Sequence, residues 1–249
     1  MSRGRKLLVS MALFLTGACI AVSSGNAQDE PRQLPVSGRS DTSPASSSFY
    51  VLANTNVIVR AYAISERVDS GSWLKVILKV DNTDCSEAIR QPVSPWHGGQ
   101  EVVAVCALGA YPNHVYNIVA EASHSEGATP PKVVVDAREA SGYEGVAVAR
   151  ESVSIGIWPN RSGALRVSGY VLGENGRGGN YSAKIQFDGS DRPCVGPLTR
   201  SGSGGQEILP SSEFSCSRSV QSGSRAKVTL STTPENGSYI RSVRLHVSF

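Results

Sequence analysis

The sequence predicts an all-β protein made of two tandem immunoglobulin-like antiparallel β-sandwich domains, each with one disulfide. Three observations predict this class. Apolar and polar residues alternate with period two in several segments, turn residues separate these segments, and four cysteines fall into two local pairs within an internal repeat. No capped segment of helical periodicity reaches about 12 residues, which excludes the common α/β folds.

The N-terminal 27 residues match a secretory signal peptide. A basic start is followed by the apolar run 7–22 and by the small residues at 25–27 that precede cleavage. The run is short for a membrane span of about 20 residues, and no second apolar run follows, so no transmembrane span is expected. We therefore expect an exported protein that is periplasmic or extracellular.

Cys19 leaves an alternative open. The segment Leu15-Thr16-Gly17-Ala18-Cys19 resembles a bacterial lipobox, whose cysteine is lipidated. Cys19 is thus a candidate lipidation site, and an outer-membrane lipoprotein is the alternative localisation.

Residues 28–47 are rich in serine and proline and contain few apolar side chains. Such a segment buries too little surface to offset chain entropy. It is predicted to be a disordered tether, followed by domain 1 over residues 48–140 and domain 2 over residues 151–249.

The charge balance shows no excess of basic residues of the kind that nucleic-acid binding requires. The chain has 24 basic and 21 acidic residues, and removal of the signal leaves 21 of each. The second domain nevertheless carries eleven basic and seven acidic residues, whereas the first carries seven and ten. This asymmetry favours docking of the two domains on each other or an anionic partner of the second.

Several landmarks occur twice in the same order. Val59–Ala63 parallels Val167–Val171, and the sequence Gly-Gly-Gln-Glu at 98–101 recurs at 204–207. An acidic turn precedes a cysteine in both copies. The repeat period of about 108 residues indicates domain duplication rather than a short solenoid repeat.

Strands are expected at regular spacing in both copies. Alternation is clearest in 74–80, 181–187 and 243–249, and further strands are expected at 57–64, 102–108, 115–122, 132–137, 153–158, 165–172 and 226–231. Turn residues such as Asn175-Gly176 and Asn236-Gly237 separate them.

The cysteines are predicted to pair locally. An exported chain meets an oxidising compartment, and no C-x-x-C motif suggests a zinc or redox site. The two pairs predicted are Cys85–Cys106 and Cys194–Cys216.

No catalytic or metal-binding motif emerges. His97, His114, His124 and His246 have no metal-site spacing, and the hydrolase elbow G-x-S-x-G is missing from the sequence. The acidic turns at Asp81 and Asp188 are explained by turn chemistry rather than by calcium. A non-enzyme without metal or cofactor is therefore predicted.

The candidate binding loop is Trp96-His97-Gly98-Gly99. A Trp and a His on a glycine-rich loop can stack on a sugar ring or anchor a protein. The alternative is that Trp96 folds over the end of the sandwich and shields the disulfide.

Residues 49–63 resemble the opening strands of small calcium-dependent bacterial lectins, which are β-sandwiches that bind fucose or mannose. The Asp/Asn-rich calcium loop of that family has no counterpart at 132–150. No sugar-binding residue is carried over, and membership of that family is not inferred.

Together these observations predict an exported, non-catalytic binding or adhesion protein that recognises a glycan or protein through loops at the sandwich ends. The alternative is a structural accessory subunit of a bacterial envelope assembly, and a secreted hydrolase comes third. No nucleic-acid partner is expected.

Overall fold

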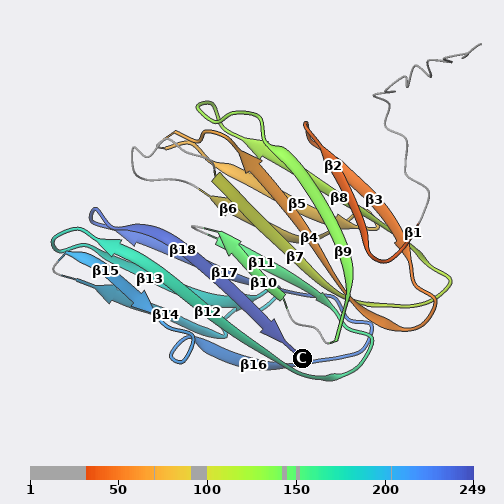
Figure 1. Cartoon of the computed structure of the whole chain (residues 1–249). Helices are drawn as coiled ribbons and strands as arrows, with labels where there is room; N and C mark the ends of the chain where they lie inside the picture. Colours follow the sequence, from red (N-terminus) through yellow and green to blue (C-terminus); the bar gives the residue numbers. More distant parts are fainter. Residues whose placement is uncertain (1–31, 70, 91–99, 142–144, 150–151, 203) are drawn as a thin grey trace, which may run out of the picture.

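The computed structural model describes residues 32–249 except 70, 91–99, 142–144, 150–151 and 203. Every element in this part of the chain is a β-strand, which confirms the all-β prediction (Figure 1). None of the described residues belongs to a helix with the length and apolar character needed to cross a bilayer.

The strands fall into two halves. The first half comprises β1 (Arg32–Gln33), β2 (Val36–Ser40), β3 (Ala45–Tyr50), β4 (Thr55–Ser65), β5 (Leu74–Val80), β6 (Thr83–Arg90), β7 (Gln100–Ala110), β8 (Val115–His124) and β9 (Lys132–Ala140). The second comprises β10 (Gly145–Ala149), β11 (Ser152–Trp158), β12 (Gly163–Asn175), β13 (Asn180–Phe187), β14 (Val195–Ser201), β15 (Gly205–Leu209), β16 (Ser215–Val220), β17 (Ala226–Glu235) and β18 (Tyr239–Ser248).

The predicted alternation is the reason that these segments form strands. In β5 every second side chain, from Leu74 to Val80, is fully buried, while the intervening residues are partly exposed. Successive side chains of a strand point to opposite faces, so an apolar residue at every second position fills the space between two layers. The same holds in β18, where Val243, Leu245 and Val247 are buried.

The first half is a two-layer sandwich with the strand order of a jelly roll. One layer runs β2–β9–β4–β7 and the other β3–β8–β5–β6. From β2 to β9 the strands therefore follow two Greek-key connections, as in jelly-roll sandwiches. An immunoglobulin order would instead place the strands as ABED and CFG, so the sandwich class is confirmed while its topology differs from the immunoglobulin one.

The second half repeats this order. Its layers run β10–β18–β12–β15/β16 and β11–β17–β13–β14, so each strand has a counterpart eight to nine places earlier in the chain. The disulfides Cys85–Cys106 and Cys194–Cys216 form as predicted. They join equivalent places, β6 to β7 in one half and the residue just before β14 to β16 in the other. The duplication read from the sequence thus reappears as a repeated topology.

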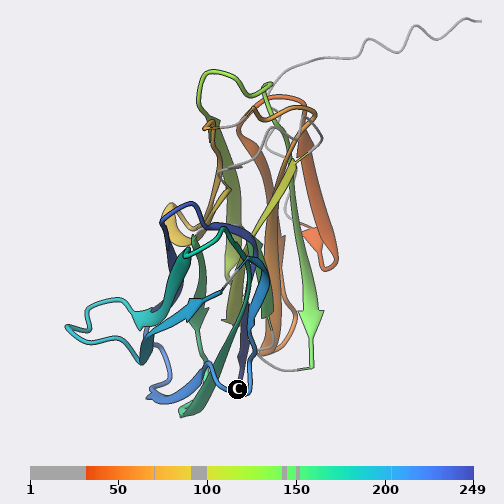
Figure 2. The ribbon, with the colours of Figure 1, turned by 90° about the vertical axis from the view of Figure 1, so that its left-hand side faces the viewer.

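The two halves share a continuous seam rather than a linker. β6 pairs with the start of β11, and β7 pairs in parallel with its remainder, from Ile155 to Trp158. β10 pairs with β18 and also meets β7 at Val148 and Val103. Both layers therefore run on from one half into the other; Figure 2 shows the second half, in teal and blue, against the first half, in orange and green. The buried apolar side chains of the two halves form one cluster.

Two predicted boundaries are wrong. The segment 28–47 was expected to be disordered, but its described part, 32–47, contains β1, β2 and the start of β3. β2 pairs with β9, and Val36 and Ala45 are buried. Backbone pairing stabilises this serine-rich segment despite its few apolar residues. The second half likewise starts at β10, within the stretch 141–150 that separates the two predicted domains. The signal peptide and Cys19 lie outside the described residues.

Candidate functional site

The predicted binding loop Trp96-His97-Gly98-Gly99 lies outside the described residues. On the described surface, aromatic and polar side chains meet in a groove of about 400 Å³ at one end of the seam. Pockets of this size at domain boundaries, lined by apolar walls and a few polar groups, are typical ligand sites.

Loops from both halves build this groove, which we call the seam groove. The first half contributes the turn between β5 and β6 and the turn between β7 and β8, including Tyr111 and His114. The second half contributes the end of β11, at Trp158, and the loop between β16 and β17, at Ser224 and Arg225. Neither half alone completes it.

A hydrogen-bonded cluster fixes the first wall. The Asp81 carboxylate accepts the backbone N–H of Asn117 at 2.9 Å, and its other oxygen lies 2.8 Å from Nε2 of His114. The His114 ring stands edge-on to Tyr116, with ring centroids 4.4 Å apart. Burial raises the pKa of Tyr116, whose hydroxyl accepts the backbone N–H of Tyr111 at 2.9 Å. This hydrogen bond fixes the backbone of Tyr111, whose side chain is exposed.

The acidic turn at Asp81 serves as a turn, in agreement with the sequence interpretation. Asp81 and Asn82 have φ angles of 48° and 60°, which Asp and Asn tolerate at the tip of a tight hairpin. Both carboxylate oxygens of Asp81 are already bonded to the protein. Within the described ranges, no group of three or more His, Cys, Asp or Glu side chains is placed to hold a metal ion.

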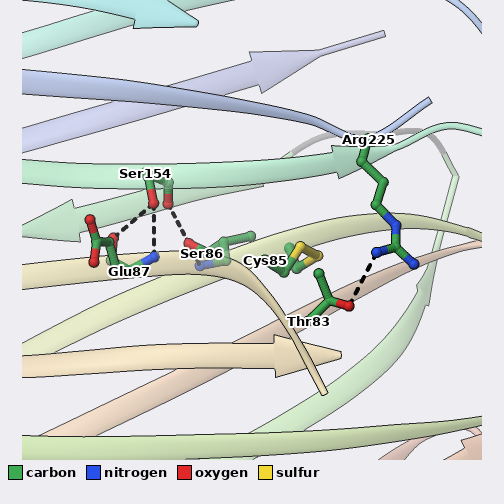
Figure 3. The surroundings of a disulfide bond; sticks show 8 residues. Thr83, Cys85, Ser86, Glu87, Ser154 and Arg225 are labelled. Atoms are coloured by element: carbon green, nitrogen blue, oxygen red, sulfur yellow. Dashed lines mark hydrogen bonds between the residues drawn. A yellow bond between two sulfur atoms is a disulfide. The ribbon is translucent and has the colours of Figure 1, made fainter. Parts of the chain in front are cut away.

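The second wall is an arginine laid on a tryptophan. The Arg225 guanidinium lies 4.4 Å from the centre of the Trp158 ring, a distance typical of cation–π contacts. Nη1 of Arg225 also donates to the Thr83 hydroxyl of the first half at 3.1 Å (Figure 3). The planar charge is thus held in place at the groove by both halves.

Buried hydrogen bonds next to the first disulfide hold the two walls together. Ser86 donates to the carbonyl of Ser154, and the Ser154 hydroxyl accepts the backbone N–H of Glu87 at 2.8 Å (Figure 3). Both serines are buried, with exposures of 1% and 0%. Buried polar groups that are fully bonded favour one arrangement of the parts they join. The groove is therefore largely preformed.

Sequence reasoning missed this site. It assigned no function to His114, and none to Tyr111 or Trp158. A usable signal was present: Tyr111-Pro112 and Trp158-Pro159 are both aromatic–proline pairs that end a strand. What the sequence does not show is that the parallel pairing of β7 with β11 brings the two strand ends together.

Comparisons with known proteins identify no family. No family model matches the chain, and no curated protein matches it. Among solved structures, PNGF-II aligns at 8% identity and a TM-score of 0.31, covering 86% of this chain and 65% of that one. A Paenibacillus xanthan lyase aligns at 13% identity and a TM-score of 0.25, covering 88% of this chain and 25% of that one. Similarity this low assigns neither fold nor function.

Proposed function

We propose that this protein is an exported, non-catalytic saccharide-binding protein that holds its ligand in the seam groove. The observation that carries the proposal is the groove itself, where Tyr111, Trp158 and Arg225 surround a preformed hollow together with Asp81 and His114. The two disulfides fit an oxidising compartment. The periplasm or the cell exterior is the proposed location.

The composition of the groove suits a sugar better than a purely apolar ligand. Aromatic faces bind the C–H face of a sugar ring, while carboxylate, imidazole and guanidinium groups bind its hydroxyls. Tyr111 is 42% exposed and lines the groove, so part of its side chain is accessible to a ligand. Trp, Tyr and Arg are also the residue types that dominate binding energy at recognition sites.

Binding to an array of oligosaccharides tests the proposal. We expect wild-type protein to bind at least one oligosaccharide, and Tyr111→Ala to weaken that binding by about tenfold, equivalent to about 1.4 kcal/mol. Trp158→Ala should weaken it further, because Trp158 also positions Arg225. Thermal melts show whether each variant remains folded.

Tyr239→Ala is the matched control. Tyr239 also lies under an arginine, Arg241, but neither residue lines the seam groove. Its replacement should leave binding unchanged. If the wild-type protein binds no oligosaccharide, or if Tyr111→Ala and Tyr239→Ala behave alike, the seam groove is not a saccharide site.

A further inference from the structure

A second hollow adjoins the seam groove, and its lining is basic. This pocket of about 300 Å³ lies in the second half and shares Ser224 and Arg225 with the groove. Arg218, Lys227 and Asp188 also line it. With Arg225, the lining therefore contains three cationic groups and one carboxylate. We call it the basic pocket.

Stacking on an aromatic ring holds both guanidinium groups of the basic pocket. Arg218 lies 4.8 Å from the centre of the Phe187 ring, as Arg225 lies over Trp158. Among the described side chains, no carboxylate forms an ion pair with either arginine. The stacking fixes the guanidinium planes while leaving their charge uncompensated.

The carboxylates that Lys227 meets among the described side chains are distant. Its amine lies 3.9 Å from the Asp188 carboxylate and 4.0 Å from that of Glu87. These separations are at the outer limit of an ion pair, and the Asp188 side chain is 59% exposed. The local excess of positive charge is therefore not neutralised within the described part of the protein.

We propose that the saccharide bound by this protein is acidic, with a sugar ring in the seam groove and a carboxylate or sulfate group in the basic pocket. This inference rests on the proposed function and names its ligand class. Arginine presents its donors in a planar fork that matches such oxyanions with two parallel hydrogen bonds. Arg225, which lines both hollows, would contact the ring and the anionic group of one ligand.

The test compares matched pairs of oligosaccharides by calorimetry on the full mature, oxidised protein. Each uronate oligomer is paired with its neutral methyl ester, and each sulfated oligomer with its desulfated form. We expect the acidic member to bind about tenfold more tightly, and the preference to shrink as salt is raised. Arg218→Gln should remove most of the preference and leave the affinity for the neutral member unchanged, because Arg218 lies outside the seam groove.

Arg244→Gln is the matched control, since Arg244 stacks on Tyr170 in the same half but lines neither hollow. Equal binding of both members would overturn the acidic-ligand inference while the proposed function stands. Binding of neither member would overturn both. If Arg218→Gln and Arg244→Gln reduce the preference for the acidic member equally, the inference is also overturned, because the preference then reflects general charge attraction. Tighter binding to anionic phospholipid vesicles than to any acidic saccharide would overturn it as well, because the ligand would then be a lipid.

Discussion

Tyr181 shows how a single side chain is fitted into this sandwich. Its ring is fully buried in the second half, and its hydroxyl donates to the carbonyl of Glu207 at 3.1 Å. The ring lies against Gly173 of the facing layer, where a β-carbon would overlap it. Burial raises the pKa of Tyr181 to about 12. The folded protein therefore favours the neutral phenol.

Because of this pKa shift, the contribution of Tyr181 to the stability of the fold depends on alkaline pH. The ordinary tyrosine pKa is about 10, so the stabilising contribution of the neutral phenol is complete below pH 10 and is lost as pH rises through 12. We predict that Tyr181→Phe costs about 1 kcal/mol at pH 7, from the lost hydrogen bond. The variant should also lose less stability than wild type between pH 10 and 12. Urea unfolding across this range measures both effects.

Tyr111→Phe serves as the control, because it removes one phenol from an exposed position. It should leave the alkaline loss of stability as in the wild-type protein. A Tyr181→Phe variant whose stability falls as steeply as that of wild type would contradict the assignment.

At the scale of elements, β11 is the strand on which the seam depends. It pairs with β17 in its own half and with β6 and β7 of the other half. Gly156 lies at the centre of this strand, opposite Cys106, and a β-carbon there would overlap the carbonyl oxygen and the sulfur of Cys85. Only a residue without a side chain allows β11 to approach the disulfide.

Gly156→Ala is therefore predicted to destabilise the protein by about 2–4 kcal/mol, because backbone at the seam has to move. Gly163→Ala is the matched control. The atoms nearest to a β-carbon at Gly163 would belong to the Phe249 ring, a side chain that can shift more readily than backbone, so the cost should be smaller. Chemical denaturation measures both, and equal costs would show that β11 is not tightly held at Gly156.

The strands that the sequence predicted are those with a clear apolar alternation, such as β5, β13 and β18. β2, β14 and β16 escaped prediction because polar residues, glycine and proline dominate them, and partner strands rather than their own side chains keep them extended. Local pairs of cysteines predicted the disulfides correctly. The seam groove was not predictable in this way, since it depends on pairing between strands about 50 residues apart, β7 and β11.

On the scale of the whole molecule, the earlier division at residues 48 and 151 cuts through the fold. A fragment that starts at residue 48 lacks β1 and β2, and one that starts at 151 lacks β10. Each half nevertheless contains both sandwich layers and its own disulfide. Independent folding of the halves remains a prediction, with fragments 32–141 and 145–249 as the appropriate ones.

We predict that each fragment gives a cooperative melt at a lower temperature than the whole chain, because β6, β7 and β11 lose their seam partners. Mixed in equal amounts, the fragments should associate and regain part of the lost stability. Calorimetric melts and sedimentation of the mixture check this. Fragments that melt like the whole chain and stay separate would show that the seam contributes little.

The order of strands across the seam determines whether further repeats could join the two halves through the same contact. The halves meet head to tail, with β6 and β7 of one against β10 and β11 of the other, so the contact is heterologous and does not close on itself. Such a contact would allow a row of further repeats at either end. At one end, however, β1 pairs in parallel with the end of β3. Because β3 is the counterpart of β11, β1 occupies the position there that β7 occupies on β11. At the other end Pro197 lies in β14, where a proline withholds the donor that another strand would need. Each of these two features opposes the addition of a strand by the contact that joins the two halves.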